Sequence, residues 1–133
     1  MVAFNFQKQF ADKIKSNHKR STIRQSKRCK PGDSLQLYTG QRTKNCVLIA
    51  ERKCQHVMGI RLDRSSPVDG KQQNYAFTRG NDHEPWSGLA GQRLTNLVRH
   101  EGFNSADEMF DFFENQYGLP FVGHIITWEP DHS

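Results

Sequence analysis

Two stretches of alternating apolar and polar residues, separated by a turn, set the first limit on how this chain can fold. Ile23 in the first stretch and Leu35 and Leu37 in the second alternate with polar neighbours, as residues of a half-buried strand do. The sequence Pro31-Gly32-Asp33 between them is typical of a turn. The pattern predicts a strand over residues 21–25, a loop over 26–33 and a second strand over 34–38.

Further stretches predict the rest of a sheet. Residues 46–51 and 54–62 are rich in β-forming residues, which indicates two strands or one long bent strand with a bulge near Arg52 and Lys53. Residues 121–128 predict the last strand. Residues 63–88 carry many turn-forming residues and little periodicity, so we expect a long loop or insertion there, of a length that often carries function in small domains.

Three helices are expected beside this sheet. The first, ending near residue 17, has an apolar face made of Phe6, Phe10 and Ile14. The second has an apolar face made of Leu89, Leu94, Leu97 and Val98. The third is marked by its ends, because Ser105 and Glu108 form a capping box and Gly118 stands where a C-terminal cap belongs.

The length of 133 residues fits a single domain, residues 1–133. The expected fold is α+β, a small barrel-like sheet that is curled and mostly antiparallel, with about three flanking helices. No apolar run approaches the roughly 20 residues of a membrane span, and no secretory signal is recognisable, so we expect a cytoplasmic protein. Three cysteines without a CxxC pair and six scattered histidines predict no disulfide, metal site or cofactor.

The net charge of +5 is distributed unevenly along the chain. Residues 1–53 contain 13 lysines and arginines against three acidic residues, whereas residues 54–133 contain six against 11. A basic half beside an acidic half indicates a positively charged face for an anionic partner such as nucleic acid or a nucleoside ligand. A face that is simply solvated is the alternative interpretation.

The segment Lys19-Arg20-Ser21-Thr22-Ile23-Arg24 concentrates cations and hydroxyls at the beginning of a strand. If Lys19 lies on the turn before the strand, its ammonium can reach back over Thr22, and a neutral lysine can activate a threonine hydroxyl as a nucleophile. Glu101, just before the third helix, could protonate a leaving amine. In the alternative interpretation, Thr22 is an ordinary strand residue and Lys19 a surface charge.

The order of these segments resembles a known family. An amphipathic helix, then Lys-x-x-Thr-Ile-Arg, then Pro-Gly-Asp and Leu-x-Leu-Tyr-x-Gly-x-Arg, is similar to the ASCH domain of the PUA-like β-barrel superfamily, over most of the chain. Within that group the chain resembles the small bacterial amidohydrolases that deacylate N(4)-acetylcytidine. The resemblance implies a threonine nucleophile, an adjacent lysine and a glutamate, at positions matching Thr22, Lys19 and Glu101.

The preferred hypothesis is therefore a metal-independent amidohydrolase that removes an acyl group from the exocyclic amine of N(4)-acylated cytidine or a related nucleoside. The residues expected to bind this substrate are Arg20, Arg24, Tyr38, Arg42 and Lys44. Ribonuclease-like members of the family use a tyrosine and a lysine, for which Tyr38 and Lys44 have matching spacing.

The alternative hypothesis is an RNA-binding module or weak ribonuclease. Its phosphate contacts would come from Arg20, Arg24, Lys27, Arg28, Lys30, Arg42 and Lys44. Tyr38 or Trp86 would be available for base stacking. A third hypothesis is a domain whose basic face binds an acidic protein.

Overall fold

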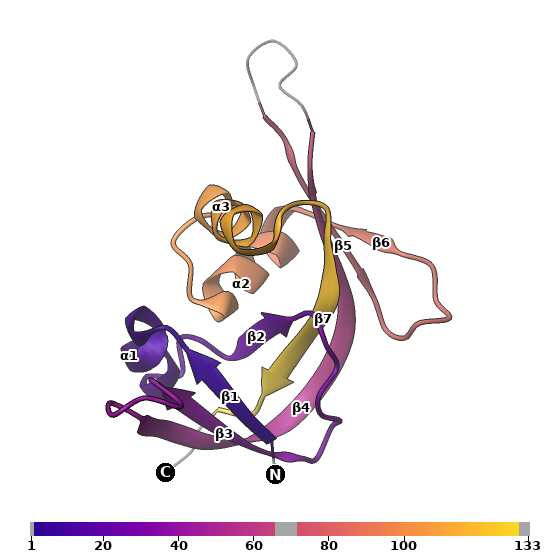
Figure 1. Cartoon of the computed structure of the whole chain (residues 1–133). Coiled ribbons are helices and arrows are strands. Elements are labelled where there is room, and N and C mark those ends of the chain that lie inside the picture. The colour runs from indigo at the N-terminus through magenta and orange to yellow at the C-terminus, as the bar shows by residue number, and fades with distance from the viewer. Residues whose placement is uncertain (1, 66–71, 131–133) are drawn as a thin grey trace.

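The computed structural model describes residues 2–65 and 72–130, and their fold is α+β (Figure 1). The strands are β1 (Val2–Phe6), β2 (Ser21–Arg24), β3 (Ser34–Thr39), β4 (Val47–Arg64), β5 (Asn74–Arg79), β6 (Ser87–Leu89) and β7 (Phe121–Trp128). The helices are a 3-10 turn, η1 (Lys8–Phe10), and α1 (Ala11–Lys15), α2 (Gly91–Glu101) and α3 (Ala106–Tyr117). Within the described residues no helix is both long and apolar enough to cross a membrane.

Strand β4 organises the sheet, because it pairs antiparallel with β3, β5 and β7. Cys54 N–H donates to the Asp33 carbonyl beside β3, whereas the Lys53 carbonyl accepts from Glu129 N–H beside β7. Adjacent strand residues direct their backbone groups to opposite edges, so β3 and β7 flank β4 on different sides. The sheet is mixed, since β1 runs parallel to β3 while β2 and β6 are antiparallel to β7 and β5.

The curled sheet is not a closed barrel in the described part of the chain. The strand order is β1-β3-β4-β7-β2, with β5 and β6 continuing from the other half of β4. β1 and β2 lie at the two ends of the first series and approach each other without pairing (Figure 1). We call the gap between these two strands the seam.

The prediction of one long bent strand over residues 46–62 is confirmed, since β4 runs unbroken from Val47 to Arg64. Its irregularities lie between Leu48 and Ala50, where the register with β3 shifts, and between Cys54 and His56, where the register with β7 shifts, and not at Arg52 and Lys53. The extra residue in a bulge bends a strand and increases its twist. The N-terminal half of β4 can therefore pair with β3, while its C-terminal half pairs with β5 and β7.

The first predicted helix is wrong over its N-terminal half. Phe6 belongs to strand β1, where it and Phe4 are both buried at a spacing of two, as strand geometry requires. Phe10 ends the 3-10 turn and Ile14 lies in the five-residue helix α1. The three apolar residues spaced four apart thus belong to three different elements, and all three are buried in the same core.

The long loop predicted over residues 63–88 is also wrong in part. It contains β5, whose Ala76 and Thr78 are buried in strand alternation, and β6, which pairs with β5. Leu89 ends β6 and does not belong to the second helix, which begins at Gly91. Residues 66–71 of the predicted loop lie outside the described residues.

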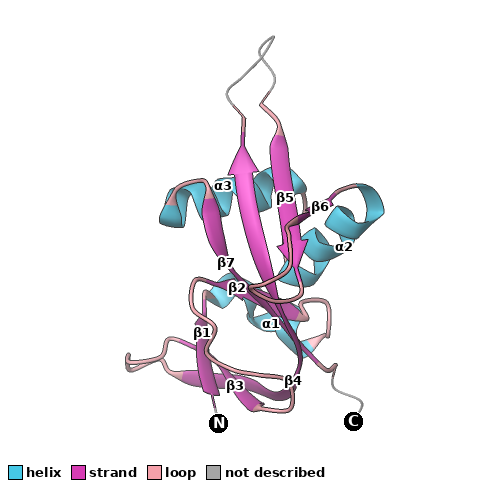
Figure 2. Ribbon diagram, turned by 90° about the vertical axis from the view of Figure 1, so that its right-hand side faces the viewer, coloured by secondary structure: helices cyan, strands magenta, loops and turns pink. Residues whose placement is uncertain are grey.

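The helices α2 and α3 lie on one side of the sheet formed by β4, β5 and β7 (Figures 1 and 2). The predicted ends of α3 are confirmed, because Ser105 Oγ accepts a hydrogen bond from Glu108 N–H and Gly118 is the C-cap. Arg64 at the end of β4 forms ion pairs with Asp111 (2.8 Å) and Glu114 (3.4 Å) of α3. This anchorage fixes α3 over the sheet, with its C-terminal turn toward the seam.

Candidate active site

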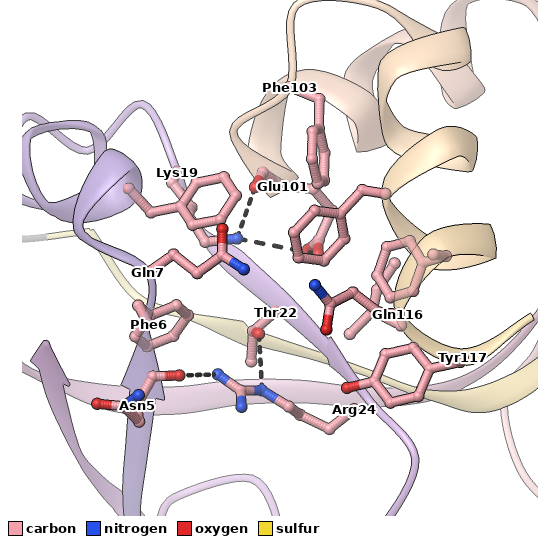
Figure 3. Close-up of a pocket in the computed structure, with 14 residues that line it drawn as sticks. Asn5, Phe6, Gln7, Lys19, Thr22, Arg24, Glu101, Phe103, Gln116 and Tyr117 are labelled. Atoms are coloured by element: carbon pink, nitrogen blue, oxygen red, sulfur yellow. Dashed lines mark hydrogen bonds and ion pairs between the residues drawn. The ribbon is translucent and has the colours of Figure 1, made fainter. Parts of the chain in front are cut away.

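A cavity of about 160 Å³ lies at the seam, between β1, β2 and α3 (Figure 3). Polar side chains that line it are Asn5, Gln7, Lys19, Thr22, Arg24, Glu101, Gln116 and Tyr117. Aromatic side chains that line it are Phe6, Phe10, Phe103, Phe112 and Phe113. The cavity thus combines a polar group on the sheet with apolar rings, which is the usual composition of a small-molecule site.

Lys19 is buried at the wall of this cavity, with 3% of its surface exposed. Its backbone N–H donates to the Lys13 carbonyl, which fixes the turn between α1 and β2. Its Nζ donates to the carbonyls of Ser21 (2.7 Å) and Glu101 (2.6 Å) and lies 4.8 Å from the centre of the Phe10 ring. Lys19 is therefore not a surface charge, contrary to the alternative interpretation of the sequence.

Glu101 is the last residue of α2 and is 2% exposed. Its Oε1 lies 3.9 Å from Lys19 Nζ, and its Oε2 accepts a hydrogen bond from the Ser21 hydroxyl. The next residue, Gly102, has a φ of +94°, and a Cβ there would stand 3.0 Å from Phe10 Cδ1 and 3.3 Å from Lys19 Cδ. Glycine is therefore needed at this position both for the turn and for the packing of the lysine stem.

Burial lowers the pKa of Lys19 from 10.5 to about 8. Removing the ammonium from water is the largest cause, and the nearby Arg24 and Lys13 lower the pKa further, while Glu101 opposes them. The two carbonyl hydrogen bonds use two N–H groups, which a neutral amine also possesses. Lys19 can thus lose its third proton without losing either hydrogen bond.

Thr22 and Arg24 form a second polar group in the same cavity. Arg24 Nε donates to Thr22 Oγ1 at 3.0 Å, and Arg24 Nη2 donates across the seam to the Asn5 carbonyl at 2.7 Å (Figure 3). The guanidinium also lies 5.0 Å from the centre of the Phe6 ring. Burial lowers the pKa of Arg24 from its usual value. The arginine therefore both bridges the seam and orients the threonine hydroxyl.

The structure brings Lys19, Thr22 and Glu101 to one cavity, although Glu101 is far from the other two in sequence. It differs from expectation in one respect. Within the described chain no hydrogen bond joins Lys19 Nζ to Thr22 Oγ1, whose partner is Arg24. The hydroxyl proton of Thr22 remains free for donation, because its oxygen is the acceptor in that contact.

Of the five residues predicted to bind substrate, the cavity includes Arg24 only. Arg20 is exposed and its Nε donates to the Asn17 carbonyl. Tyr38 lies on β3 and its hydroxyl contacts Gln36 at 3.2 Å. Arg42 and Lys44 are exposed in the turn between β3 and β4. A role for these four residues stays a prediction, on a surface separate from the cavity.

Several residues of the site were not predicted from the sequence. Ser21 stands inside the basic motif, but its role depends on a carboxylate 80 positions away. Gln116 and Tyr117 follow Phe112 and Phe113 on the apolar face of α3, and this helical spacing was the available signal. Gln7 comes from the turn after β1, which the sequence presented as part of a helix.

Among residues 2–65 and 72–130, no cluster of three histidine, cysteine or acidic side chains could hold a metal ion. In comparisons with known proteins, no family model, curated protein or solved structure matches this chain.

Proposed function

We propose that the cavity at the seam is the active site of an amidohydrolase that removes the acyl group from N(4)-acylated cytidine or a related nucleoside. One observation carries the proposal: Lys19, Thr22 and Glu101 line a single cavity, and the lysine is buried with a pKa of about 8. A lysine with this pKa is in part neutral near physiological pH and can act as a base.

The first half of the proposed reaction forms an acyl-enzyme. Thr22 Oγ1 attacks the acyl carbonyl and its proton passes to Lys19 Nζ, through substrate-induced closure or one water, since the two groups are not in contact beforehand. Arg24, already donating to Thr22 Oγ1, stabilises negative charge on that oxygen. The C–N bond then breaks, and the Lys19 and Glu101 pair returns one proton to the departing cytosine amine.

The second half is hydrolysis of the threonine ester. A water attacks the ester carbonyl and gives its proton to the Lys19 and Glu101 pair, and Thr22 recovers a proton as the carboxylic acid leaves. The sum is amide and water giving amine and acid, and the described side chains account for every proton. The aromatic rings of Phe112 and Phe113 supply an apolar wall for the planar base or the acyl group.

We propose in addition that the fold is an ASCH-type, PUA-like barrel whose closure is incomplete at the seam. The strand order β1-β3-β4-β7-β2 supports this, because it places the first and last strands of the series side by side. The Arg24 side chain bridges them in place of a hydrogen-bond ladder.

The test is release of cytidine from N(4)-acetylcytidine by the purified protein, followed by chromatography. We expect turnover by the wild type and losses of roughly 100-fold or more for Thr22→Val, Lys19→Met and Glu101→Gln. The matched control is Thr95→Val, which changes an exposed threonine of α2 outside the cavity. Full activity in Thr22→Val would overturn the proposed nucleophile, and no turnover by the wild type would overturn the substrate.

RNA binding by the basic half of the chain is the second candidate function. The observation that favours it is that six of the proposed phosphate-binding cations, all except Arg24, are exposed. Such binding should weaken steeply with salt, because each cation that neutralises a phosphate releases a counterion. With these six contacts to a single strand, the slope of log affinity against log salt concentration would be about -4.

A further inference from the structure

The outer side of the β4–β5 hairpin carries a groove of about 400 Å³, distant in the fold from the seam. We call this groove the outer face, and it is lined by Arg61, Asp63, Tyr75, Phe77 and Trp86. Arg61 lies opposite Phe77, and Asp63 lies opposite Tyr75, in the register of the two strands. These side chains therefore share one face of the hairpin and form two neighbouring cross-strand pairs.

Nothing within the described residues covers this face with a helix. The alternate residues Ile60, Leu62 and Ala76 belong to the buried core together with Met109 and Phe110 of α3. The helices α2 and α3 lie on one side of the sheet (Figure 2). An antiparallel sheet covered on one side normally carries polar residues on the other. Here the uncovered side carries three aromatic rings, and Tyr75 is 43% exposed. Phe77 and Trp86 are half-buried, so within the described residues part of each ring stays accessible to a partner.

Two arginines accompany these rings. The Arg79 guanidinium lies 4.2 Å from the centre of the Trp86 ring, and the Arg61 guanidinium 6.0 Å from that of Phe77. Arg61 is 3.5 Å from Asp63 and Arg79 is 3.8 Å from Asp82, so both ion pairs are longer than a normal hydrogen bond. The Nε atoms of both arginines are buried and have no hydrogen-bond partner among the described residues. Their donors are thus incompletely used.

We propose that the outer face binds single-stranded RNA, with bases stacked on Phe77 and Trp86 and phosphates paired to Arg61 and Arg79. Rings and guanidinium planes in one open groove are the combination that unpaired bases require. The phosphate oxygens would accept from the terminal Nη groups of the two arginines, whose ion pairs with Asp63 and Asp82 are long. The Asp63 carboxylate, beside Tyr75, offers an acceptor for a ribose 2′-hydroxyl, which DNA lacks.

The charge on the outer face predicts a salt dependence of RNA binding that differs from that of the basic half of the chain. Asp63 and Asp82 offset the two arginines, so stacking supplies most of the affinity and only about two phosphates are neutralised. The slope of log affinity against log salt concentration should then be about -1.4. Binding through the basic half of the chain would give a slope several times steeper. The inference does not depend on the proposed deacylase activity, because none of its residues lines the cavity at the seam.

The experiment uses the whole chain and a fluorescein-labelled ten-residue oligouridylate, with affinity measured by anisotropy and with Trp86 emission as a second readout. We expect saturable binding, quenching of tryptophan emission, and a loss of about five- to 100-fold in Phe77→Ala and Trp86→Ala. The matched control is Leu48→Ala, which truncates an exposed apolar residue at the other end of β4. Melting curves identify any variant that has lost its fold.

Three outcomes would overturn the proposal. The first is no saturable binding by the wild type, and the second is unchanged affinity in both aromatic variants. The third is equal affinity for the oligodeoxyuridylate of the same length, which would remove the assignment to RNA. The variant Asp63→Asn tests the preference for RNA further. It keeps an acceptor oxygen and removes a negative charge, so it should retain the preference while raising the affinity for both the RNA and the DNA oligonucleotide.

Discussion

The Ser21 hydroxyl donates a hydrogen bond to the Glu101 carboxylate, which joins β2 to the end of α2. Both residues are 2% exposed, and both also accept a hydrogen bond from Lys19 Nζ through their backbone carbonyls. The three residues form a closed set of contacts at the wall of the cavity. A buried carboxylate requires such donors, because removing it from water without them is costly.

Removing the Ser21 hydroxyl should weaken both folding and catalysis. Ser21→Ala leaves one oxygen of a buried carboxylate without its donor, at a cost of about 1–3 kcal/mol in the free energy of unfolding. Glu101 should also lose its orientation, so kcat should fall more than KM rises. Urea denaturation and steady-state deacylation measure the two effects. Ser21→Thr keeps the hydroxyl and should restore most of both; an equal loss in Ser21→Thr would assign the effect to packing.

The burial of Lys19 should make stability depend on pH. Its pKa is about 8 when folded and 10.5 when exposed, so between these values the unfolded chain holds a proton that the folded chain lacks. Unfolding then takes up a proton, and stability rises with pH. Below pH 8 the charged lysine costs the fold on the order of 3 kcal/mol, and this cost disappears as pH approaches 10.5.

Lys19→Met removes this dependence, although it also leaves two carbonyls without a donor. From pH 8 to pH 10, the unfolding free energy of the wild type should therefore rise relative to that of Lys19→Met. Urea denaturation at each pH measures it. Lys8→Met, which removes an exposed lysine, is the control. A difference that stays constant over this range would contradict the lowered pKa of Lys19.

Gly102→Ala should disturb the site through the lysine stem. The added Cβ meets Phe10 and Lys19 Cδ at 3.0 and 3.3 Å, in a backbone conformation that already costs an alanine about 1 kcal/mol. Gly32→Ala is a matched control, because Gly32 has nearly the same φ, +95°, and has open space around it. We expect Gly32→Ala to lower stability by the backbone cost of about 1 kcal/mol with activity unchanged, and Gly102→Ala to lower stability by more than this and to lower deacylation as well.

Arg24→Lys should open the seam while keeping the charge. A lysine cannot make the two hydrogen bonds that Arg24 gives to Thr22 Oγ1 and the Asn5 carbonyl. The amide protons of β1 should then exchange faster with solvent, and kcat of the proposed deacylation should fall by about tenfold or more because the proposed nucleophile, Thr22, loses its orientation. Hydrogen exchange followed by mass spectrometry measures the first effect. Unchanged exchange in residues 2–6 would show that the arginine does not hold the seam.

The elements predicted well are those with a complete local signal. The caps at Ser105 and Gly118 mark α3, and the alternation around Leu35 and Leu37 marks β3. β5 and β6 were missed because β5 forms as a strand by pairing with β4 and β6 by pairing with β5, which local composition does not reveal. The first helix was predicted wrongly because a spacing of four was satisfied by residues of three elements.

The candidate site also has residues that local sequence reveals and contacts that only the fold creates. Lys19 and Thr22 stand in a short motif and could be singled out from it. The hydrogen bonds of Ser21 to Glu101 and of Arg24 to Asn5 join residues 80 and 19 positions apart, and only the folded chain creates these distances. The outer face likewise could not be predicted from the sequence, since Phe77 and Arg61 meet only through the register of β4 and β5.

The sharing of β4 by three neighbouring strands has a consequence for how the chain would acquire the proposed activity. The residues of the site come from β1, the β2 segment, α2 and α3, and β4 connects all their supporting strands through contacts distant in sequence. Such contacts form late in folding, because long loops must close first. A nascent or partly unfolded chain therefore has no working site, and recovery of deacylation during refolding should coincide with protection of the β4 amides.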